Sequence, residues 1–156
     1  MTSASLLTEL IERYLSTCDM RFLRDERGGA YFCVPNAHYG RLNVQFEISS
    51  SFGDVLTVKV SPATSLPIAD RPWLTHFADT WNLRNREVTA LLHNSAGPQR
   101  IGLVARRSQW IRDDVCFDDF ASFVDRTLAA AIDLFAESAQ VGDSLSTGES
   151  VLRDAG

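Results

Sequence analysis

The stretch LNVQFEISSSFGDVLTVKV, residues 42–60, decides the fold of this chain. Apolar and polar residues alternate along both of its halves, which is the two-residue period of half-buried strands. Gly53-Asp54 between the halves can supply the backbone geometry of a tight turn. The alternation predicts an antiparallel hairpin with one apolar face, formed by Leu42, Val44, Phe46, Ile48, Leu56, Val58 and Val60. Such a hairpin is marginal alone and needs other strands or helices against that face.

The flanking sequence supplies this cover. Apolar residues recur at helical spacing near residues 5–17, 71–84 and 117–138. Short apolar runs separated by glycine-containing turns predict two more hairpins, over residues 20–34 and 88–105. We therefore expect an α+β fold of the order α-β-β-β-β-α-β-β-α, with an antiparallel β-sheet built from hairpins and packed by helices.

The apolar pattern ends near Ala139. Residues 140–156 are mostly Gly, Ser, Thr, Asp and Glu, with isolated Val and Leu. They offer too little apolar area to offset the entropy lost on ordering. We expect one domain over residues 1–139 and a disordered tail over residues 140–156.

Composition excludes several classes of protein. The 156 residues carry a net charge of -5, which disfavours a nucleic-acid partner because phosphate binding needs clustered positive charge. No segment approaches the roughly 20 apolar residues of a membrane helix, and the N-terminus lacks the basic start of a secretory signal. Cys18, Cys33 and Cys116 are odd in number and widely spaced, as expected of reduced thiols. We expect a cytoplasmic protein with neither a nucleic-acid nor a membrane partner.

Motifs of catalysis are missing from the sequence. It has no Gly-x-Gly-x-x-Gly, Walker or Gly-x-Ser-x-Gly motif, and its three histidines, His38, His76 and His93, are far apart. Cys116 could be a reactive thiolate beside a helix start, but nearby carboxylates favour an ordinary packed thiol. The acidic group of residues 113–119 lacks the pattern of a calcium loop and is better explained by helix capping. We predict no enzyme, with no catalytic residues, no cofactor and no metal.

The segment Phe77-Ala78-Asp79-Thr80-Trp81-Asn82, followed by the polar run of residues 83–86, resembles a helix end of the YbjN-type family. These proteins are described as bacterial sensory-transduction regulators and share a fold with type III secretion chaperones. The element order resembles theirs over roughly residues 6–136. The resemblance implies an antiparallel sheet covered by helices and a binding role, and it supplies no catalytic residues. Asn82 is expected to have a structural role, either as a cap or in a hydrogen bond across to the next strand.

Two surfaces are candidates for that role. If Phe32 and Val34 face the core, then Tyr31 and Cys33 face outward and, with Tyr39 and Val55, form a protein-interaction surface. The leading hypothesis is a non-enzymatic interaction module, chaperone-like or regulatory, in a bacterial stress or signalling context. Its partner is another protein of unknown identity.

The alternative hypothesis is a sensor for a small anionic ligand or nucleotide. Its surface surrounds the third predicted hairpin and is formed by Arg100, Arg106, Arg107, Arg112 and Trp110. Arginines that merely protect a solvated strand edge are the simpler interpretation of the same pattern.

The expected uncovered face of the sheet also predicts a homodimer. Its outward apolar residues would be Tyr31, Cys33, Val55, Leu91 and Val104. An exposed apolar area of that size is unusual for a monomer, and two-fold pairing is the commonest way for a chain to bury its own patch.

Overall fold

The predicted central hairpin is present in the computed structural model, which describes residues 3–25, 27, 29–33, 42–94 and 97–154. It consists of β3 (Leu42–Ile48) and β4 (Val55–Pro62), and Phe46 lies opposite Val58 in the antiparallel register. The other elements are α1 (Ser3–Thr17), β1 (Phe22–Asp25), β2 (Ala30–Cys33), β5 (Leu66–Pro67), the 3-10 turn η1 (Ile68–Asp70), α2 (Arg71–Arg84), β6 (Thr89–Asn94), β7 (Arg100–Trp110) and α3 (Phe117–Asp154). The α+β class and the predicted element order are confirmed, with β5 and η1 added between β4 and α2.

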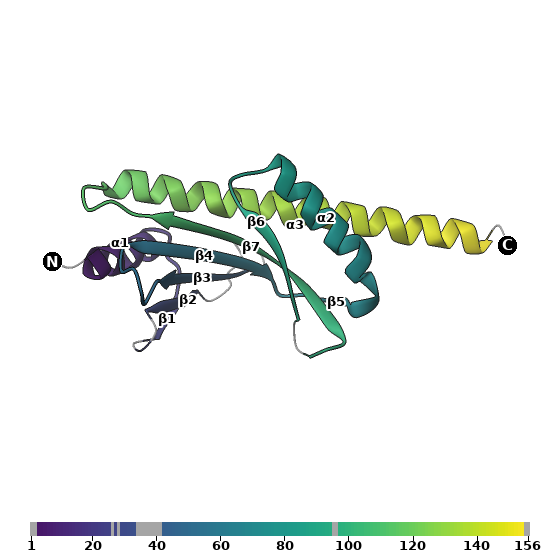
Figure 1. Ribbon diagram of the computed structural model, residues 1–156, viewed down its shortest axis with the longest axis horizontal. Coiled ribbons are helices and arrows are strands. Elements are labelled where there is room, and N and C mark those ends of the chain that lie inside the picture. Colours follow the sequence, from purple (N-terminus) through teal and green to yellow (C-terminus); the bar gives the residue numbers. More distant parts are fainter. Residues whose placement is uncertain (1–2, 26, 28, 34–41, 95–96, 155–156) are drawn as a thin grey trace.

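The strands form a seven-stranded sheet in the described part of the chain (Figure 1). Its order is β1-β2-β3-β4-β7-β5, and β6 pairs with the other edge of β7. The long strand β7 joins the halves of the sheet, because its second half pairs with β4 while its first half pairs with β5 and β6. All these pairings are antiparallel, as hairpins require.

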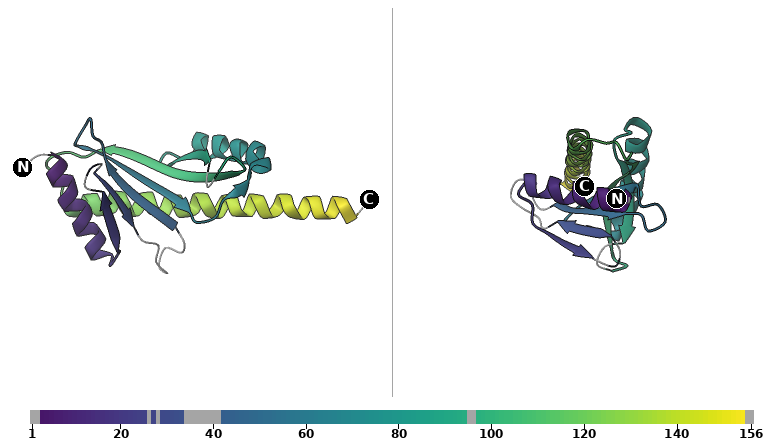
Figure 2. Two further views of the ribbon diagram at one scale, coloured as in Figure 1. Left: turned by 90° about the horizontal axis from the view of Figure 1, so that it is seen from below. Right: turned by 90° about the vertical axis from the view of Figure 1, so that its left-hand side faces the viewer.

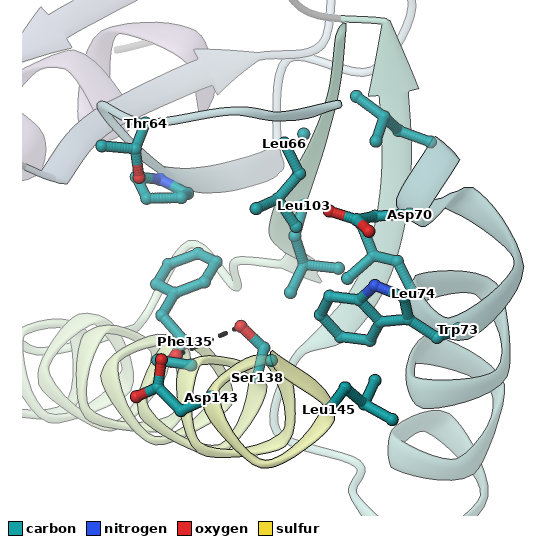
Figure 3. Close-up of a pocket in the computed structure, with 15 residues that line it drawn as sticks. Thr64, Leu66, Asp70, Trp73, Leu74, Leu103, Phe135, Ser138, Asp143 and Leu145 are labelled. Carbon is teal, nitrogen blue, oxygen red and sulfur yellow. Dashed lines mark hydrogen bonds between the residues drawn. The ribbon is translucent and has the colours of Figure 1, made fainter. Parts of the chain in front are cut away.

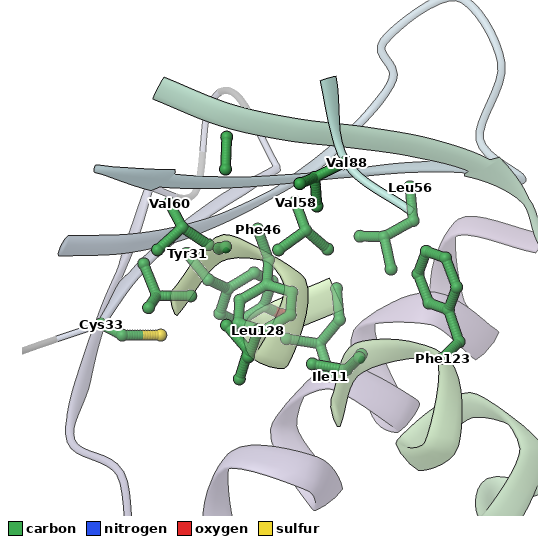
Figure 4. Packing of buried hydrophobic residues seen from close by; sticks show 14 of the residues in the cluster. Ile11, Tyr31, Cys33, Phe46, Leu56, Val58, Val60, Val88, Phe123 and Leu128 are labelled. Carbon is green, nitrogen blue, oxygen red and sulfur yellow. The ribbon is translucent and has the colours of Figure 1, made fainter. Parts of the chain in front are cut away.

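Helices α1 and α3 cover one face of the sheet, and α2 lies against β6 (Figure 2). Figure 4 shows the strand side chains Phe46, Val58 and Val60 directed at the helices, where they meet Ile11 and Leu128. The Tyr14 hydroxyl donates a 2.6 Å hydrogen bond to Asp125 Oδ1 and so ties α1 to α3. The apolar stripe of each helix and the apolar face of the hairpin therefore form one core.

The last helix is longer than the sequence predicts. We expected it to end near residue 138, but α3 continues to Asp154 and runs past the sheet beside α2 (Figure 1). Within this extension Gly142 lies against the Trp73 ring of α2, since a Cβ on Gly142 would be 3.6 Å from Trp73 Cη2. This contact between helices was not visible in the apolar pattern of the extension. The mobility expected of residues 140–156 stays a prediction.

Candidate functional site

Helix α2 is fixed to the edge strand β6 by the Trp81-Asn82 pair. The Trp81 indole N–H donates to the Val88 carbonyl over 3.2 Å. Asn82 bonds twice to Ala90: its amide donates to the carbonyl at 3.0 Å, and its oxygen accepts from the backbone N–H at 2.8 Å. The Asn82 side chain thus bonds to β6 as a further strand would at this point of the edge. These are hydrogen bonds to the next strand, one of the two roles expected of Asn82. The position of α2 against β6 follows from these bonds.

The predicted orientation of β2 is wrong. Tyr31 is fully buried and Cys33 is 7% exposed, whereas Phe32 is 45% exposed. Directly opposed residues of paired strands share a face, and Tyr31 and Cys33 lie opposite Phe46 and Val44 of β3. Because the apolar face of β3 is the core face, Tyr31 and Cys33 must face the core as well.

Burial changes the chemistry of both side chains. Desolvation raises the pKa of Cys33 to about 12, and it also raises the pKa of Tyr31. The Tyr31 hydroxyl donates to Glu12 Oε1 of α1 over 3.4 Å. Tyr31 and Cys33 are therefore core residues and form no interaction surface.

The rest of the predicted interaction surface is dispersed. Tyr39 lies outside the described residues. Val55 is half-buried and pairs with Trp110, which is 59% exposed at the end of β7 and donates its indole N–H to Asp54. Leu23 of β1 is 70% exposed and lies opposite Phe32, so the larger exposed apolar pair is at the other end of the sheet.

The five residues of the predicted anionic-ligand surface do not form one site. Arg100 stands at the start of β7 and donates to Ser65, while Arg112 follows the end of β7 and lies 3.3 Å from Asp114. An extended strand of this length separates them by about 30 Å. Arg107 pairs with Glu87 and stacks 4.9 Å from the Phe123 ring centre.

Arg106 and Arg107 nevertheless line one cavity together, which we call the second cavity. It has a volume of about 480 Å³ at the edge between β6 and β7, and Arg86, Thr89 and Ser108 also line it. Three guanidinium groups and two hydroxyls can donate to an anion. Glu87 lines the same cavity and opposes an anionic ligand.

The carboxylates at the start of α3 stabilise the N-terminus of this helix. Asp118 and Asp119 lie in its first turn, where backbone donors and the helix dipole favour carboxylates. The Sγ atom of Cys116 accepts the Asp119 backbone N–H over 3.4 Å, so this thiol caps the helix. Among the residues that the structure describes, no group of three or more His, Cys, Asp or Glu side chains could hold a metal ion.

A cavity of about 530 Å³ lies between α2, α3 and the start of β7 (Figure 3). Trp73 and Leu74 of α2 face Phe135 and Ser138 of α3 across it. We call this the α2–α3 pocket. The Ser138 hydroxyl donates to the Phe135 carbonyl over 3.2 Å, as the dashed line in Figure 3 shows.

Sequence reasoning missed this pocket because its walls come from segments with different expected roles. Trp73 belongs to the helix expected over residues 71–84, whereas Gly142, Asp143 and Leu145 belong to the tail expected to be disordered. One available signal was Gly142 beside the apolar Val141, just beyond a long helical pattern, since a glycine within a helix can mark a close contact.

The fold has a counterpart among solved structures. It matches YbjN of E. coli, proposed to be a transcription regulator, with a TM-score of 0.59 and 15% identity over 82% of this chain and 90% of that one. It also matches the ExsC–ExsE complex with a TM-score of 0.46 and 11% identity, over 84% of this chain and 92% of that one. No protein-family model and no curated protein matches the sequence. The chain therefore has a YbjN-type fold, as the resemblance in residues 77–82 implies.

The described helices were also compared with the length and hydropathy of membrane spans. Even α3 lacks an apolar stretch long enough to cross a bilayer, and the same holds for the other helices in the described residues.

Proposed function

We propose that this protein is a non-enzymatic interaction module, chaperone-like or regulatory, that acts in the bacterial cytoplasm by binding another protein. The α2–α3 pocket carries the proposal. Its volume of about 530 Å³ and its apolar and aromatic lining, with Trp73, Leu74 and Phe135, suit the anchor side chains of a partner. The YbjN-type fold is compatible with this role.

Affinity capture with the full chain tests the proposal. Trp73 is half-buried in the pocket, and Trp110 is exposed at the far end of β7. A partner that binds saturably to the native chain and to Trp110→Ala, but not to Trp73→Ala, supports the proposal. Absence of a saturable partner, or a partner that Trp73→Ala retains fully, contradicts it. Circular dichroism of both variants checks that they are folded.

The second cavity favours one further candidate, a sensor of small anionic ligands. Arg86, Arg106 and Arg107 line it together, although Glu87 opposes them. A ligand at about 100 times its dissociation constant stabilises the folded state by about 2.7 kcal/mol. A thermal-shift screen with phosphorylated metabolites should then show a rise in Tm that Arg106→Gln abolishes. If none of the metabolites raises Tm, the anionic-ligand sensor hypothesis is wrong.

We also propose that the chain is a homodimer, on a smaller surface than the sequence suggested. Tyr31 and Cys33 no longer contribute to it. Leu23 and Phe32, opposite each other on β1 and β2, are 70% and 45% exposed and form an apolar pair beside the sheet edge. Two-fold pairing would bury this pair twice.

A further inference from the structure

The α2–α3 pocket combines an apolar floor with acidic groups on opposite walls. Asp70 lies at the start of α2, and Asp143 lies on α3 (Figure 3). Both line the pocket beside Trp73, Leu74 and Phe135. Ligand pockets of proteins commonly have this composition, with mostly apolar walls and a few polar groups that select the ligand.

The charged lining has a single sign. Among the described residues that line the pocket, the two aspartates carry charge, and arginine, lysine and histidine do not occur. The second cavity, at the edge between β6 and β7, is instead lined by Arg86, Arg106 and Arg107. A concave site lined by one sign of charge concentrates ions of the opposite sign. The α2–α3 pocket therefore favours a cation.

The aromatic lining favours the same kind of ligand. The faces of Trp and Phe rings attract ammonium and guanidinium groups, and Trp73 and Phe135 belong to opposite walls. Arginine and lysine bury an apolar stem while they hold a charged head at a polar rim. An apolar pocket with two carboxylates complements such side chains.

We propose that the α2–α3 pocket binds a peptide segment of a partner protein in which a large apolar side chain is followed by arginine or lysine. The apolar side chain packs between Trp73, Leu74 and Phe135, and the basic side chain lies between Asp70 and Asp143. This inference rests on the proposed function and adds the chemistry of the partner.

Titration of the 15N-labelled full chain with two matched peptides tests the inference. One peptide carries leucine and arginine, and the other carries the same leucines with glutamate in place of arginine. We expect saturable binding of the arginine peptide, with NMR shift changes centred on the backbone amides of Trp73 and Phe135. Equal binding of the two peptides, or shift changes centred elsewhere, would overturn it.

Neutral substitutions of the aspartates test the contribution of their charge to peptide binding while they keep the size of the side chain. Asp70→Asn and Asp143→Asn should each weaken binding of the arginine peptide by about two- to fivefold, the range of a solvated ion pair. Asp133→Asn is the matched control, because Asp133 is exposed on α3 and does not line the pocket. Unchanged affinity in both pocket variants, or an equal loss in the control, contradicts the proposal.

Two further results distinguish this inference from its premise. If octylammonium alone binds as tightly as the arginine peptide, the pocket takes a small amine and the peptide proposal is wrong. In the other result, a captured partner depends on Trp73 and yet binds the Asp70→Asn and Asp143→Asn variants normally. That result supports the proposed interaction module and contradicts the inferred basic segment of the partner.

Discussion

Tyr31 and Phe32 are adjacent rings with opposite surroundings. Tyr31 is fully buried, and Phe32 is 45% exposed. Tyr31→Asp should destabilise the fold by more than about 4 kcal/mol, because it leaves a cavity and an unpaired carboxylate in the core. Phe32→Asp should cost the fold of a single chain no more than about 1 kcal/mol. Urea unfolding of both variants, followed by circular dichroism, measures the difference, and a reversed order would contradict the register of β2.

Asn82 satisfies both backbone groups of Ala90. Asn82→Asp keeps the acceptor for the Ala90 N–H but loses the donor to its carbonyl. We expect a loss of about 1–3 kcal/mol in the free energy of unfolding, since a half-buried carbonyl is left facing a carboxylate. Asp79→Asn, at an exposed position on the same helix, is the control. Equal stabilities of Asn82→Asp and the native chain would show that the paired bonds contribute little.

The Cys33 thiol makes the free energy of unfolding depend on pH in the alkaline range. Burial raises its pKa to about 12 from a usual value near 9. The folded state thus prefers the neutral thiol, so its contribution is complete below pH 9 and is lost as the pH rises toward 12. The stability difference between the native chain and Cys33→Ala should shrink over that interval. A difference that is constant with pH would show that the folded thiol titrates normally.

At the scale of elements, Gly142 is an unfavourable residue within α3. A Cβ there would meet Trp73 Cη2 at 3.6 Å and Cζ2 at 3.8 Å, which are ordinary contacts. Gly142→Ala should therefore raise the free energy of unfolding by about 0.5–1 kcal/mol, as expected for a helix interior. Thermal unfolding measures the gain. A destabilised variant would mean that Trp73 and α3 approach more closely than in this structure.

The success of sequence reasoning differed between elements for physical reasons. Alternation along β3 and β4 is clean, so their core face was predicted correctly. Residues 30–33 of β2 are all apolar or aromatic, so their own pattern cannot distinguish the two faces, and only pairing with β3 decides. Extension of that register from β3 would have placed Tyr31 and Cys33 correctly. The pocket required the contact of α2 with α3, which strand alternation and helical spacing within one segment do not encode.

At the scale of the whole molecule, the α2–α3 pocket and the second cavity differ in the sign of their charged lining. The α2–α3 pocket has aspartates as its charged lining, and the cavity at the edge of β6 and β7 has three arginines and one glutamate. The net charge of -5 does not reveal this difference between the two cavities. Two ligands of opposite charge could therefore bind without competing for the same groups.

The exposed apolar pair on β1 and β2 predicts a homodimer in solution. Leu23 is 70% exposed and lies on β1, an edge strand in the described sheet, opposite Phe32. Light scattering coupled to size exclusion should give a mass of about twice the 17.3 kDa of one chain. Leu23→Asp should shift the mass to one chain, because an isologous interface would bury the unpaired carboxylate twice. Leu91→Asp is the control, since Leu91 is also exposed but lies on β6. A mass of one chain for the native protein across a concentration series would exclude the dimer, and a dimer that survives Leu23→Asp would place the interface elsewhere.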